Sequence, residues 1–396
     1  MNRQFSKHSF KKRNFNRHNG RPSYGRRRIK SFNPIDLINS PQVIEQKEEY
    51  LVTHSFSDFK IADDLKKNIL EKGYKSPTPI QDQVIEPILE GKDLVGIANT
   101  GTGKTAAFLV PLINKVLKDR YNKVLILAPT RELAFQIRDE FLGFSRSLKV
   151  YSCLCIGGEN IKRQIHDLSR NPNFIIATPG RILDLIRSRV VDLRDFSSVV
   201  LDEADRMVDI GFVKDIEYII SLLPKNRQSL FFSATISNDV REILESFVKN
   251  PVIISVKTRD TIENITQKVV DIQGSTSKVD TLHKLLIREE FTKVLIFGRT
   301  KHGVQRLSDE LVIRGFKSIA IHGNKNQSQR IKALEKFKRS EVQILVATDV
   351  ASRGLDIPNV SHVINYDLPE SYEAYIHRIG RTGRIDKKGV ALTFID

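Results

Sequence analysis

The sequence contains very little sulfur and no apolar stretch long enough to span a membrane. Its 396 residues include 2 cysteines, 2 methionines and no tryptophan. Two cysteines are too few for a disulfide framework and are half of the ligands that a closed zinc site requires. A transmembrane helix needs about 18 consecutive apolar residues, and the chain has no such run. We therefore exclude a disulfide-rich secreted domain and an integral membrane protein.

The two cysteines, Cys153 and Cys155, lie one residue apart in an apolar run. We interpret them as small buried residues of a protein in a reducing compartment, where thiols persist. The basic residues at the start of the chain are not followed by an apolar block, so we expect no secretory signal peptide. These features predict a cytoplasmic protein without a membrane partner, and we expect it to be a monomer.

Acidic residues are absent from residues 1–30, which contain eleven Lys or Arg side chains and most of the net charge of +17. The segment has too few apolar residues to bury a core, so we expect a disordered basic tail. Its aromatic rings lie among Arg, Lys, Asn and Gly: Phe5, Phe10, Phe15 and Tyr24. Cations that neutralise phosphates and rings that stack on bases are typical of sequence-tolerant single-strand binding. RNA contact is our hypothesis, and a solubilising or a targeting segment are the alternatives.

The pattern becomes regular from about residue 54, where short β-branched runs alternate with stretches of helical periodicity. Near-continuous apolar runs separated by helical segments are typical of buried parallel strands joined by crossovers. We expect strands at 93–98, 124–129, 174–179, 198–203, 229–234 and 251–256, and then at 294–299, 318–323, 343–348, 362–367 and 391–396.

This pattern predicts two consecutive α/β domains with parallel sheets. The first occupies residues 54–256 and the second residues 265–396, and the polar stretch 257–264 is interpreted as a linker. Residues 1–53 form the basic tail and a lead-in. Ligands of open parallel sheets bind at the carboxyl ends of the strands, so functional residues are expected there.

A glycine-rich segment follows the first expected strand and precedes a helical pattern. It reads Ala98-Asn99-Thr100-Gly101-Thr102-Gly103-Lys104-Thr105. It matches the phosphate-binding loop except that Ala98 replaces the first glycine. In such a loop backbone N–H groups and the helix N-terminus face phosphate oxygens, Lys104 reaches the β- and γ-phosphates, and the Thr105 hydroxyl ligates Mg²⁺. The alternative is an ordinary glycine-rich turn.

Charged residues that phosphoryl transfer requires occur at two further places. The expected strand 198–203 ends in Asp202 and Glu203, placed to hold Mg²⁺ and to accept the proton of an attacking water. In the second domain Arg381 and Arg384 can act as arginine fingers on the transition state. Solvated acidic and basic turns are the alternatives. If both domains contribute, ATP hydrolysis requires them to close on one another.

Residues Asp202–Asp205 spell D-E-A-D, and the other motifs along the chain occur in the same order as in one known family. On these motifs the chain resembles the DEAD-box ATP-dependent RNA helicases of superfamily 2 over about residues 54–396. The resemblance implies two tandem RecA-like domains, with ATP and Mg²⁺ as cofactors. It also implies that Gln81 in the segment 73–81 reads the adenine edge, that Phe56 packs on the base, and that Asp356 contacts the ribose. A core phenylalanine and a surface glutamine are the alternatives for Phe56 and Gln81.

The resemblance assigns two further groups of residues. Ser233 and Thr235 would link hydrolysis to strand separation through the carboxylates around Asp205. Phosphate and sugar oxygens of RNA would be contacted by Pro129, Thr130, Arg131, Gly158, Thr178, Pro179, Gly180 and Arg181 in the first domain, and by Arg299, Gln327, Arg330 and Thr348 in the second. Taken singly, each of these residues is equally well read as a turn, a cap or a surface charge.

The family implies an RNA-stimulated ATPase that separates short RNA duplexes or remodels ribonucleoproteins. Single-stranded or short duplex RNA is the expected partner, and ribosomal or RNA-decay proteins are candidate partners. An ATP-gated RNA clamp with little unwinding needs the same motifs and stays open as an alternative. A DNA translocase is disfavoured by the family match, although no residue visibly reads a 2′-hydroxyl.

Overall fold

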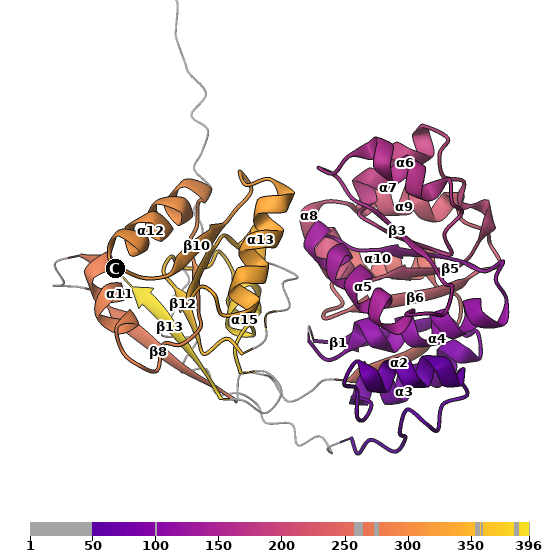
Figure 1. The fold of residues 1–396 in the computed structure, drawn as a ribbon, viewed down its shortest axis with the longest axis horizontal. Coiled ribbons are helices and arrows are strands. Elements are labelled where there is room, and N and C mark those ends of the chain that lie inside the picture. The colour runs from indigo at the N-terminus through magenta and orange to yellow at the C-terminus, as the bar shows by residue number, and fades with distance from the viewer. Residues whose placement is uncertain are drawn as a thin grey trace, which may run out of the picture. The chain divides into compact units, whose positions relative to one another are not determined.

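The structure is a computed structural model, and it describes residues 50–99, 101–256, 264–272, 277–352, 357, 359–383 and 388–395. These residues form two separate parallel sheets flanked by helices, which confirms the prediction of two α/β domains (Figure 1). No helix in these ranges is long and apolar enough to cross a bilayer. Several predictions fall outside the described residues: the tail 1–30, residues 257–263 of the linker, Thr100, Asp356 and Arg384.

The sheet of the first domain has seven strands in the order β3-β4-β2-β5-β6-β1-β7, and all of its pairs are parallel. Leu94 at the start of β1 pairs with Leu230 in β6 and with Val252 in β7. The strands are β1 (Leu94–Ala98), β2 (Lys123–Leu127), β3 (Ser152–Cys155), β4 (Phe174–Ala177), β5 (Phe196–Leu201), β6 (Gln228–Ser233) and β7 (Val252–Val256).

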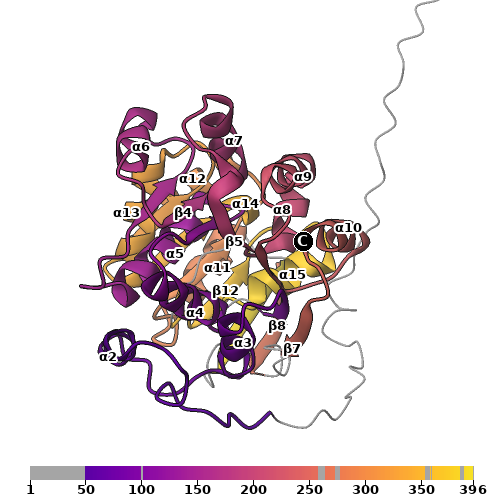
Figure 2. The same ribbon diagram turned by 90° about the vertical axis from the view of Figure 1, so that its right-hand side faces the viewer.

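Helices cover both faces of this sheet because its strands are apolar on both sides. One face packs on α2 (Asp63–Glu71), α3 (Pro79–Leu89), α4 (Lys104–Lys118) and α5 (Arg131–Phe144). The other packs on α7 (Pro179–Arg187), α8 (Ala204–Ile210), α9 (Val213–Leu222) and α10 (Asn238–Phe247), and Figure 2 shows α3 to α5 and α8 to α10 on either side of β5. The helix α6 (Ile161–Leu168) and the 3-10 turn Leu193–Asp195 complete the domain.

The second domain repeats this architecture with six parallel strands in the order β10-β11-β9-β12-β13-β8. These are β8 (Ile265–Asp271), β9 (Val294–Phe297), β10 (Ser318–Ile321), β11 (Ile344–Ala347), β12 (His362–Asn365) and β13 (Gly389–Ile395). One face packs on α11 (Lys278–Leu286) and α12 (Lys301–Ile313), and the other on α13 (Gln327–Lys338). Two further helices are α14 (Asp349–Ser352) and α15 (Tyr372–Ile379).

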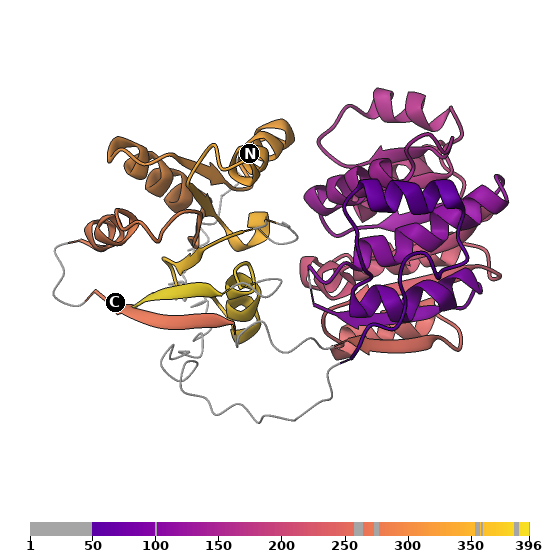
Figure 3. The ribbon, with the colours of Figure 1, turned by 60° about the horizontal axis from the view of Figure 1, so that its bottom comes forward.

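Two strands escaped the sequence prediction, and each lies at the edge of its sheet. β3 is four residues long, and every second side chain is only half-buried. β8 pairs with β13 alone, as Figure 3 shows for the yellow and orange strands, and it exposes Thr266 and Lys268. An edge strand needs no long apolar run. β8 has none, and the apolar run around Cys153 and Cys155 in β3 is short.

Candidate functional site

The strand order of the first domain gathers the predicted nucleotide residues at one place. The phosphate-binding loop follows β1, and Asp202 and Glu203 follow β5. Ser233 is the last residue of β6, and Thr235 lies just after it. These three strands are neighbours in the order β5-β6-β1 and run parallel, so their carboxyl ends lie together at one edge of the sheet. Segments more than a hundred residues apart in the sequence therefore form one site.

The phosphate-binding loop takes a conformation that requires glycine. Gly101 and Gly103 have φ of 84° and 91°, values that side chains other than glycine rarely adopt. A Cβ atom on Gly103 would lie 2.4 Å from Nε2 of Gln81, so the loop and this residue are in close contact. Within the loop the Lys104 ammonium donates to the carbonyl of Ala98 at 2.7 Å. Lys104 is thus held at the loop by a weak neutral acceptor that a phosphate can replace.

Gln81 is fixed in the first turn of α3, where the sequence provides a capping box. The Thr78 backbone N–H donates to Oε1 of Gln81 at 2.9 Å, and Nε2 of Gln81 donates to the Gly103 carbonyl at 3.0 Å. The Gln81 amide therefore joins α3 to the phosphate-binding loop. Phe56 is buried, and its ring packs edge-on against Tyr74 at 6.0 Å between centroids. Burial against these neighbours gives the Phe56 ring a fixed position.

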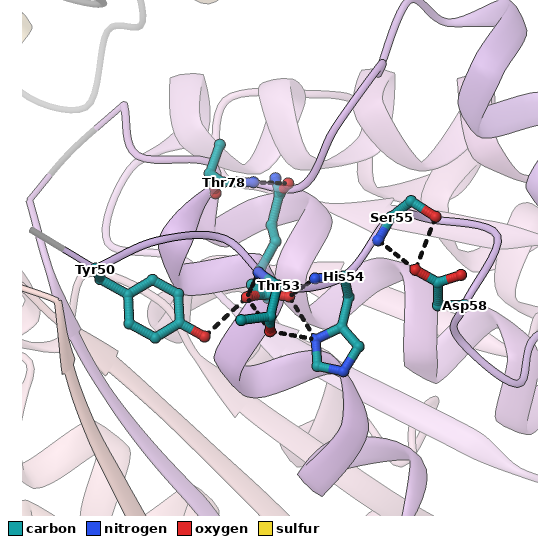
Figure 4. A network of polar contacts seen from close by, with 8 residues as sticks. Tyr50, Thr53, His54, Ser55, Asp58 and Thr78 are labelled. Atoms are coloured by element: carbon teal, nitrogen blue, oxygen red, sulfur yellow. Dashed lines mark hydrogen bonds and ion pairs between the residues drawn. The ribbon is translucent and has the colours of Figure 1, made fainter.

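Asp82, in the same turn of α3, holds the segment that precedes Phe56. Its Oδ2 accepts hydrogen bonds from the Tyr50 hydroxyl at 2.8 Å and the Thr53 backbone N–H at 2.9 Å, and its Oδ1 lies 2.7 Å from Nδ1 of His54 (Figure 4). Burial by itself would raise the pKa of Asp82, but these donors outweigh it and lower that pKa. The sequence analysis missed Asp82 because its partners lie 28 to 32 residues away.

The acidic pair after β5 is buried, with 2% of Asp202 and 7% of Glu203 exposed. Burial raises the pKa of Asp202 to about 7, against the opposing charge of Lys104. Burial would also raise the pKa of Glu203, but the charges of Arg206 and Lys104 outweigh it and lower that pKa. Nη1 of Arg206, a residue that the sequence analysis did not identify, lies 2.9 Å from Oε2 of Glu203. Glu203 is therefore ionised and able to accept a proton.

Asp205 connects the acidic pair to the end of β6. Its Oδ2 accepts hydrogen bonds from the Thr235 hydroxyl at 3.1 Å and from the backbone N–H groups of Ala234 and Thr235 at 3.2 and 3.0 Å. The Ser233 hydroxyl accepts from the Asp205 backbone N–H at 3.3 Å and donates to the Thr235 carbonyl. A displacement of either segment therefore moves the other, which is the geometry that coupling requires.

The predicted RNA residues of the first domain occupy the other half of the same sheet edge. They follow β2, β3 and β4, which are neighbours in the order β3-β4-β2. Thr130 caps α5, and its hydroxyl accepts from the Leu133 N–H at 3.3 Å. The remaining candidates lie directly after these strands: Pro129 and Arg131 after β2, Gly158 after β3, and Thr178, Pro179, Gly180 and Arg181 after β4.

Glycines after β3 leave room for the guanidinium of Arg131. A Cβ on Gly158 would lie 2.2 Å from Nη1 of Arg131, and one on Gly157 would lie 3.1 Å from Nη2. Burial lowers the pKa of Arg131. Arg131 and the Gly157–Gly158 segment, more than twenty residues apart in the sequence, therefore form one surface, in which the glycines make room for a positively charged side chain.

The predicted residues of the second domain follow a similar arrangement. Arg299 follows β9, Thr348 follows β11, and Gln327 and Arg330 lie on α13 after β10; these strands are neighbours in the order β10-β11-β9. Arg381 follows α15, and its Nε donates to the His377 carbonyl at 3.2 Å. The Arg381 guanidinium is thus oriented from its own helix end.

Arg378 is a residue of this domain that the sequence analysis missed. Its guanidinium donates to both carboxylate oxygens of Asp349, at 2.6 and 2.7 Å, and to the Asp367 carbonyl at 2.6 Å. The side chain is only 2% exposed. Because Asp349 follows Thr348 and Arg378 lies one helical turn before Arg381, this ion pair connects a predicted RNA residue to the predicted finger.

Two α/β domains, with a phosphate-binding loop after β1 and an acidic pair after β5, define a nucleotide hydrolase with RecA-like domains. The model of the DEAD/DEAH box helicase family matches residues 78–243, and the model of the helicase conserved C-terminal domain matches residues 277–386. The chain is 44% identical over 346 residues to the DEAD-box ATP-dependent RNA helicase CshA of Bacillus subtilis (strain 168), a match that covers 87% of this chain and 70% of that protein. The chain belongs to the DEAD-box helicase family.

Two solved structures are similar to this chain in both fold and sequence. Mss116p without its NTE and C-tail, bound to ssRNA and AMP-PNP, is 30% identical with a TM-score of 0.79, over 88% of this chain and 76% of that chain. Dbp5 of S. cerevisiae, bound to RNA and ADP BeF3, is 31% identical with a TM-score of 0.75, over 87% of this chain and 90% of that chain.

Proposed function

We propose that this protein is an ATP-dependent RNA helicase, which hydrolyses ATP to close on RNA and to separate or remodel short duplexes. The observation that carries the proposal is the division of one sheet edge in the first domain. The half formed by β5, β6 and β1 presents the nucleotide residues, and the half formed by β3, β4 and β2 presents the RNA residues. Both ligands are therefore read by the ends of one rigid sheet, so each can influence the other.

The residues around β1 and β5 supply the chemistry of ATP hydrolysis. Gln81 and Phe56 select the base, while the backbone of residues 98–105 and Lys104 hold the phosphates. A water molecule attacks the γ-phosphorus, the bond to the β-phosphate oxygen breaks, and ADP and phosphate leave. Glu203 accepts the proton of that water, because Arg206 and Lys104 keep its carboxylate ionised within a buried site.

Mg²⁺ would be held by Asp202 and Thr105. The donors fit this ion, since Mg²⁺ prefers carboxylate and hydroxyl oxygens. The Asp202 carboxylate is buried and accepts a hydrogen bond from the Glu203 backbone N–H at 3.0 Å. Bound there, the ion would neutralise phosphate charge.

In the second domain Arg381 and Arg384 stabilise the charge of the transition state, and Asp356 contacts the ribose. RNA phosphates bind at the ends of β3, β4 and β2 and at the ends of β10, β11 and β9. Because the two ligands require residues from both domains, hydrolysis takes place when ATP and RNA are held together. A cytoplasmic location and a monomeric state remain predictions of the sequence, as do ribosomal or RNA-decay proteins as partners.

Two assays on the full chain test this proposal. ATP turnover is measured with no nucleic acid, with RNA oligonucleotides and with DNA oligonucleotides of the same sequence, and duplex separation is measured with RNA in excess over protein. Stimulation by RNA above DNA together with multiple-turnover separation supports a helicase. Stimulation without repeated separation supports the ATP-gated clamp instead, and equal stimulation by DNA supports the translocase.

A further inference from the structure

The helix α6 buries a residue that its sequence pattern does not explain. Two of its three apolar residues, Ile161 and Ile165, are each 37% exposed, and the third, Leu168, is half-buried. Gln164 is 5% exposed and is the one buried residue of the helix. A buried amide is costly unless both its oxygen and its nitrogen have hydrogen-bond partners.

The Gln164 amide joins two segments that follow neighbouring strands. Its Nε2 donates to the Ile156 carbonyl at 3.0 Å, in the loop after β3. Its Oε1 accepts from Nη1 of Arg181 at 2.9 Å, and Arg181 lies on α7 after β4. The same Nη1 donates to the Glu159 carbonyl in the β3 loop at 3.3 Å. Both the nitrogen and the oxygen of the Gln164 amide therefore have partners, and these two bonds hold Arg181 against this loop.

The loop that Gln164 fixes is also the loop that accommodates Arg131. Gly157 and Gly158 follow Ile156 directly, and a Cβ on either one would crowd the Arg131 guanidinium. The charge of Arg181 is close enough to disfavour the charge of Arg131, although Glu132 and Glu159 oppose this effect. An anion beside the two guanidinium groups would offset their repulsion. The Gln164 amide holds Arg181 without adding a negative charge. The carboxylate nearest to Arg181 in α7 is that of Asp184, which is 57% exposed and places its Oδ2 3.8 Å from Nε of Arg181.

We propose that Gln164 is a positioning residue for RNA, which sets the Arg181 guanidinium and the Gly157–Gly158 loop as one rigid phosphate-binding surface. The inference rests on the proposed function, since it requires that Arg181 contacts the RNA backbone. Gln164 itself contacts no phosphate. Its effect on RNA is therefore exerted through Arg181 and should vanish when Arg181 is removed.

A double-mutant cycle tests this dependence. We expect Gln164→Leu to weaken RNA binding about fivefold to tenfold when Arg181 is present, and less than twofold in the Arg181→Ala background. The log–log slope of RNA affinity against salt should become shallower by about 0.7 in Gln164→Leu, the value for one lost phosphate contact on a single strand. A structural defect alone would change neither the coupling nor the salt slope.

Asn68→Leu is the matched control for the loss of a buried amide. Asn68 is 8% exposed, and its Nδ2 donates to the carbonyls of Phe144 and Arg146, both at 2.8 Å, in a part of the domain without predicted RNA residues. We expect both Leu variants to lower the thermal midpoint, and only Gln164→Leu to weaken RNA binding.

The outcomes separate the two proposals. If Arg181→Ala leaves RNA affinity and its salt slope unchanged, Arg181 is not an RNA contact and the proposed RNA surface fails. If Arg181→Ala weakens binding but Gln164→Leu weakens it equally in both backgrounds, or matches Asn68→Leu, the positioning role is refuted and the RNA surface stands.

Discussion

Among single residues, Glu203 is ionised and buried beside the phosphate-binding loop, so it is free to accept a proton. It is buried, and the positive charges of Arg206 and Lys104 lower its pKa. We predict that Glu203→Gln keeps ATP affinity and loses about 10²–10⁴ in turnover, because an amide cannot accept the proton of the attacking water. The measurement is steady-state ATPase at saturating RNA, with nucleotide binding in parallel. Glu217→Gln, on the exposed face of α9, is the control, and turnover of Glu203→Gln within threefold of wild type would reject this role.

Loss of the Lys104 side chain should weaken ATP binding, whereas loss of the Glu203 carboxylate should not. Its ammonium donates to the Ala98 carbonyl at 2.7 Å, so it lies at the loop that is to receive the phosphates. We predict that Lys104→Ala weakens ATP binding as well as turnover, because it removes a charge that contacts both the ground state and the transition state. Equilibrium titration with a fluorescent ATP analogue measures the first effect. Unchanged affinity would place Lys104 outside the phosphate site.

His362 should make the stability of the second domain depend on pH. It is 6% exposed and stacks on Phe291 at 3.9 Å between ring centroids. Burial lowers its pKa from the ordinary value of 6.5, with Glu290 opposing and Lys268 assisting the shift. A histidine kept neutral in the folded state contributes its full stability above pH 6.5, and this contribution is lost as the pH falls below that value.

We therefore predict that His362→Gln flattens the pH dependence of unfolding below pH 6.5, by up to about 1.4 kcal/mol per pH unit. Denaturant unfolding at several pH values measures this slope. The exposed His302, replaced by Gln, is the control. Equal slopes for wild type and His362→Gln would show that His362 titrates alike in the folded and unfolded states.

At the scale of secondary structure, Asp82 connects two elements that the sequence shows as separate. Five donor atoms from residues 50–54 lie within 3.3 Å of its carboxylate, so α3 fastens the segment before Phe56. Removal of a buried charged acceptor leaves these donors with poorer partners. We predict that Asp82→Asn lowers the free energy of unfolding by about 1–3 kcal/mol and raises the KM for ATP more than it lowers kcat.

Asp63→Asn, at the exposed start of α2, is the comparison for Asp82→Asn. Both variants exchange a carboxylate for an amide, but only the Asp82 carboxylate is buried and bonded to residues 50–54. Denaturant unfolding and ATPase titrations measure both effects. If Asp82→Asn lowers the stability but leaves the KM for ATP unchanged, the segment before Phe56 does not affect the nucleotide site.

The elements that could be predicted from the sequence are those whose signal is local. The central strands are continuous apolar runs, and the phosphate-binding loop lies directly between a strand and a helix, so both are visible in a short window. The edge strand β8 lacks such a run and β3 has only a short one, and both strands were missed. Gln164, Arg206 and Arg378 were missed for another reason. Their roles depend on partners brought together by the fold, and a buried amide or guanidinium has no sequence pattern of its own.

At the scale of the whole chain, the basic tail is a candidate extension of the RNA site. Residues 1–30 contain eleven cations and no acidic residue. We predict that their deletion weakens RNA binding and makes its salt dependence shallower, with ATPase at saturating RNA nearly unchanged. The log–log slope changes by about 0.7 for each phosphate that is no longer neutralised. Equal slopes with and without residues 1–30 would show that the tail does not contact RNA.

The last prediction concerns the two domains together. The phosphate-binding loop lies before residues 257–264 and Arg381 lies after them. If Arg381 acts on the nucleotide as proposed, hydrolysis requires the domains to close. Coupling between ligands is reciprocal, and we expect RNA to tighten ATP binding by the factor by which ATP tightens RNA binding, typically 5–150-fold. Arg381→Ala should remove the RNA-stimulated part of the ATPase, since an arginine finger contributes about 10³–10⁵ in rate, and leave RNA binding without nucleotide intact.

A distance between fluorophores tests closure directly. Tyr121 and Ile313 are 92% and 80% exposed, one in each domain, whereas the native Cys153 and Cys155 are buried at 3% and 0% exposed. Cysteines introduced at positions 121 and 313 can therefore be labelled selectively. We expect the distance to shorten when an ATP analogue and RNA are both present. We expect little change with either ligand alone, because one ligand is not enough to hold the two domains together. A distance that stays constant with both ligands would overturn closure as the link between hydrolysis and RNA.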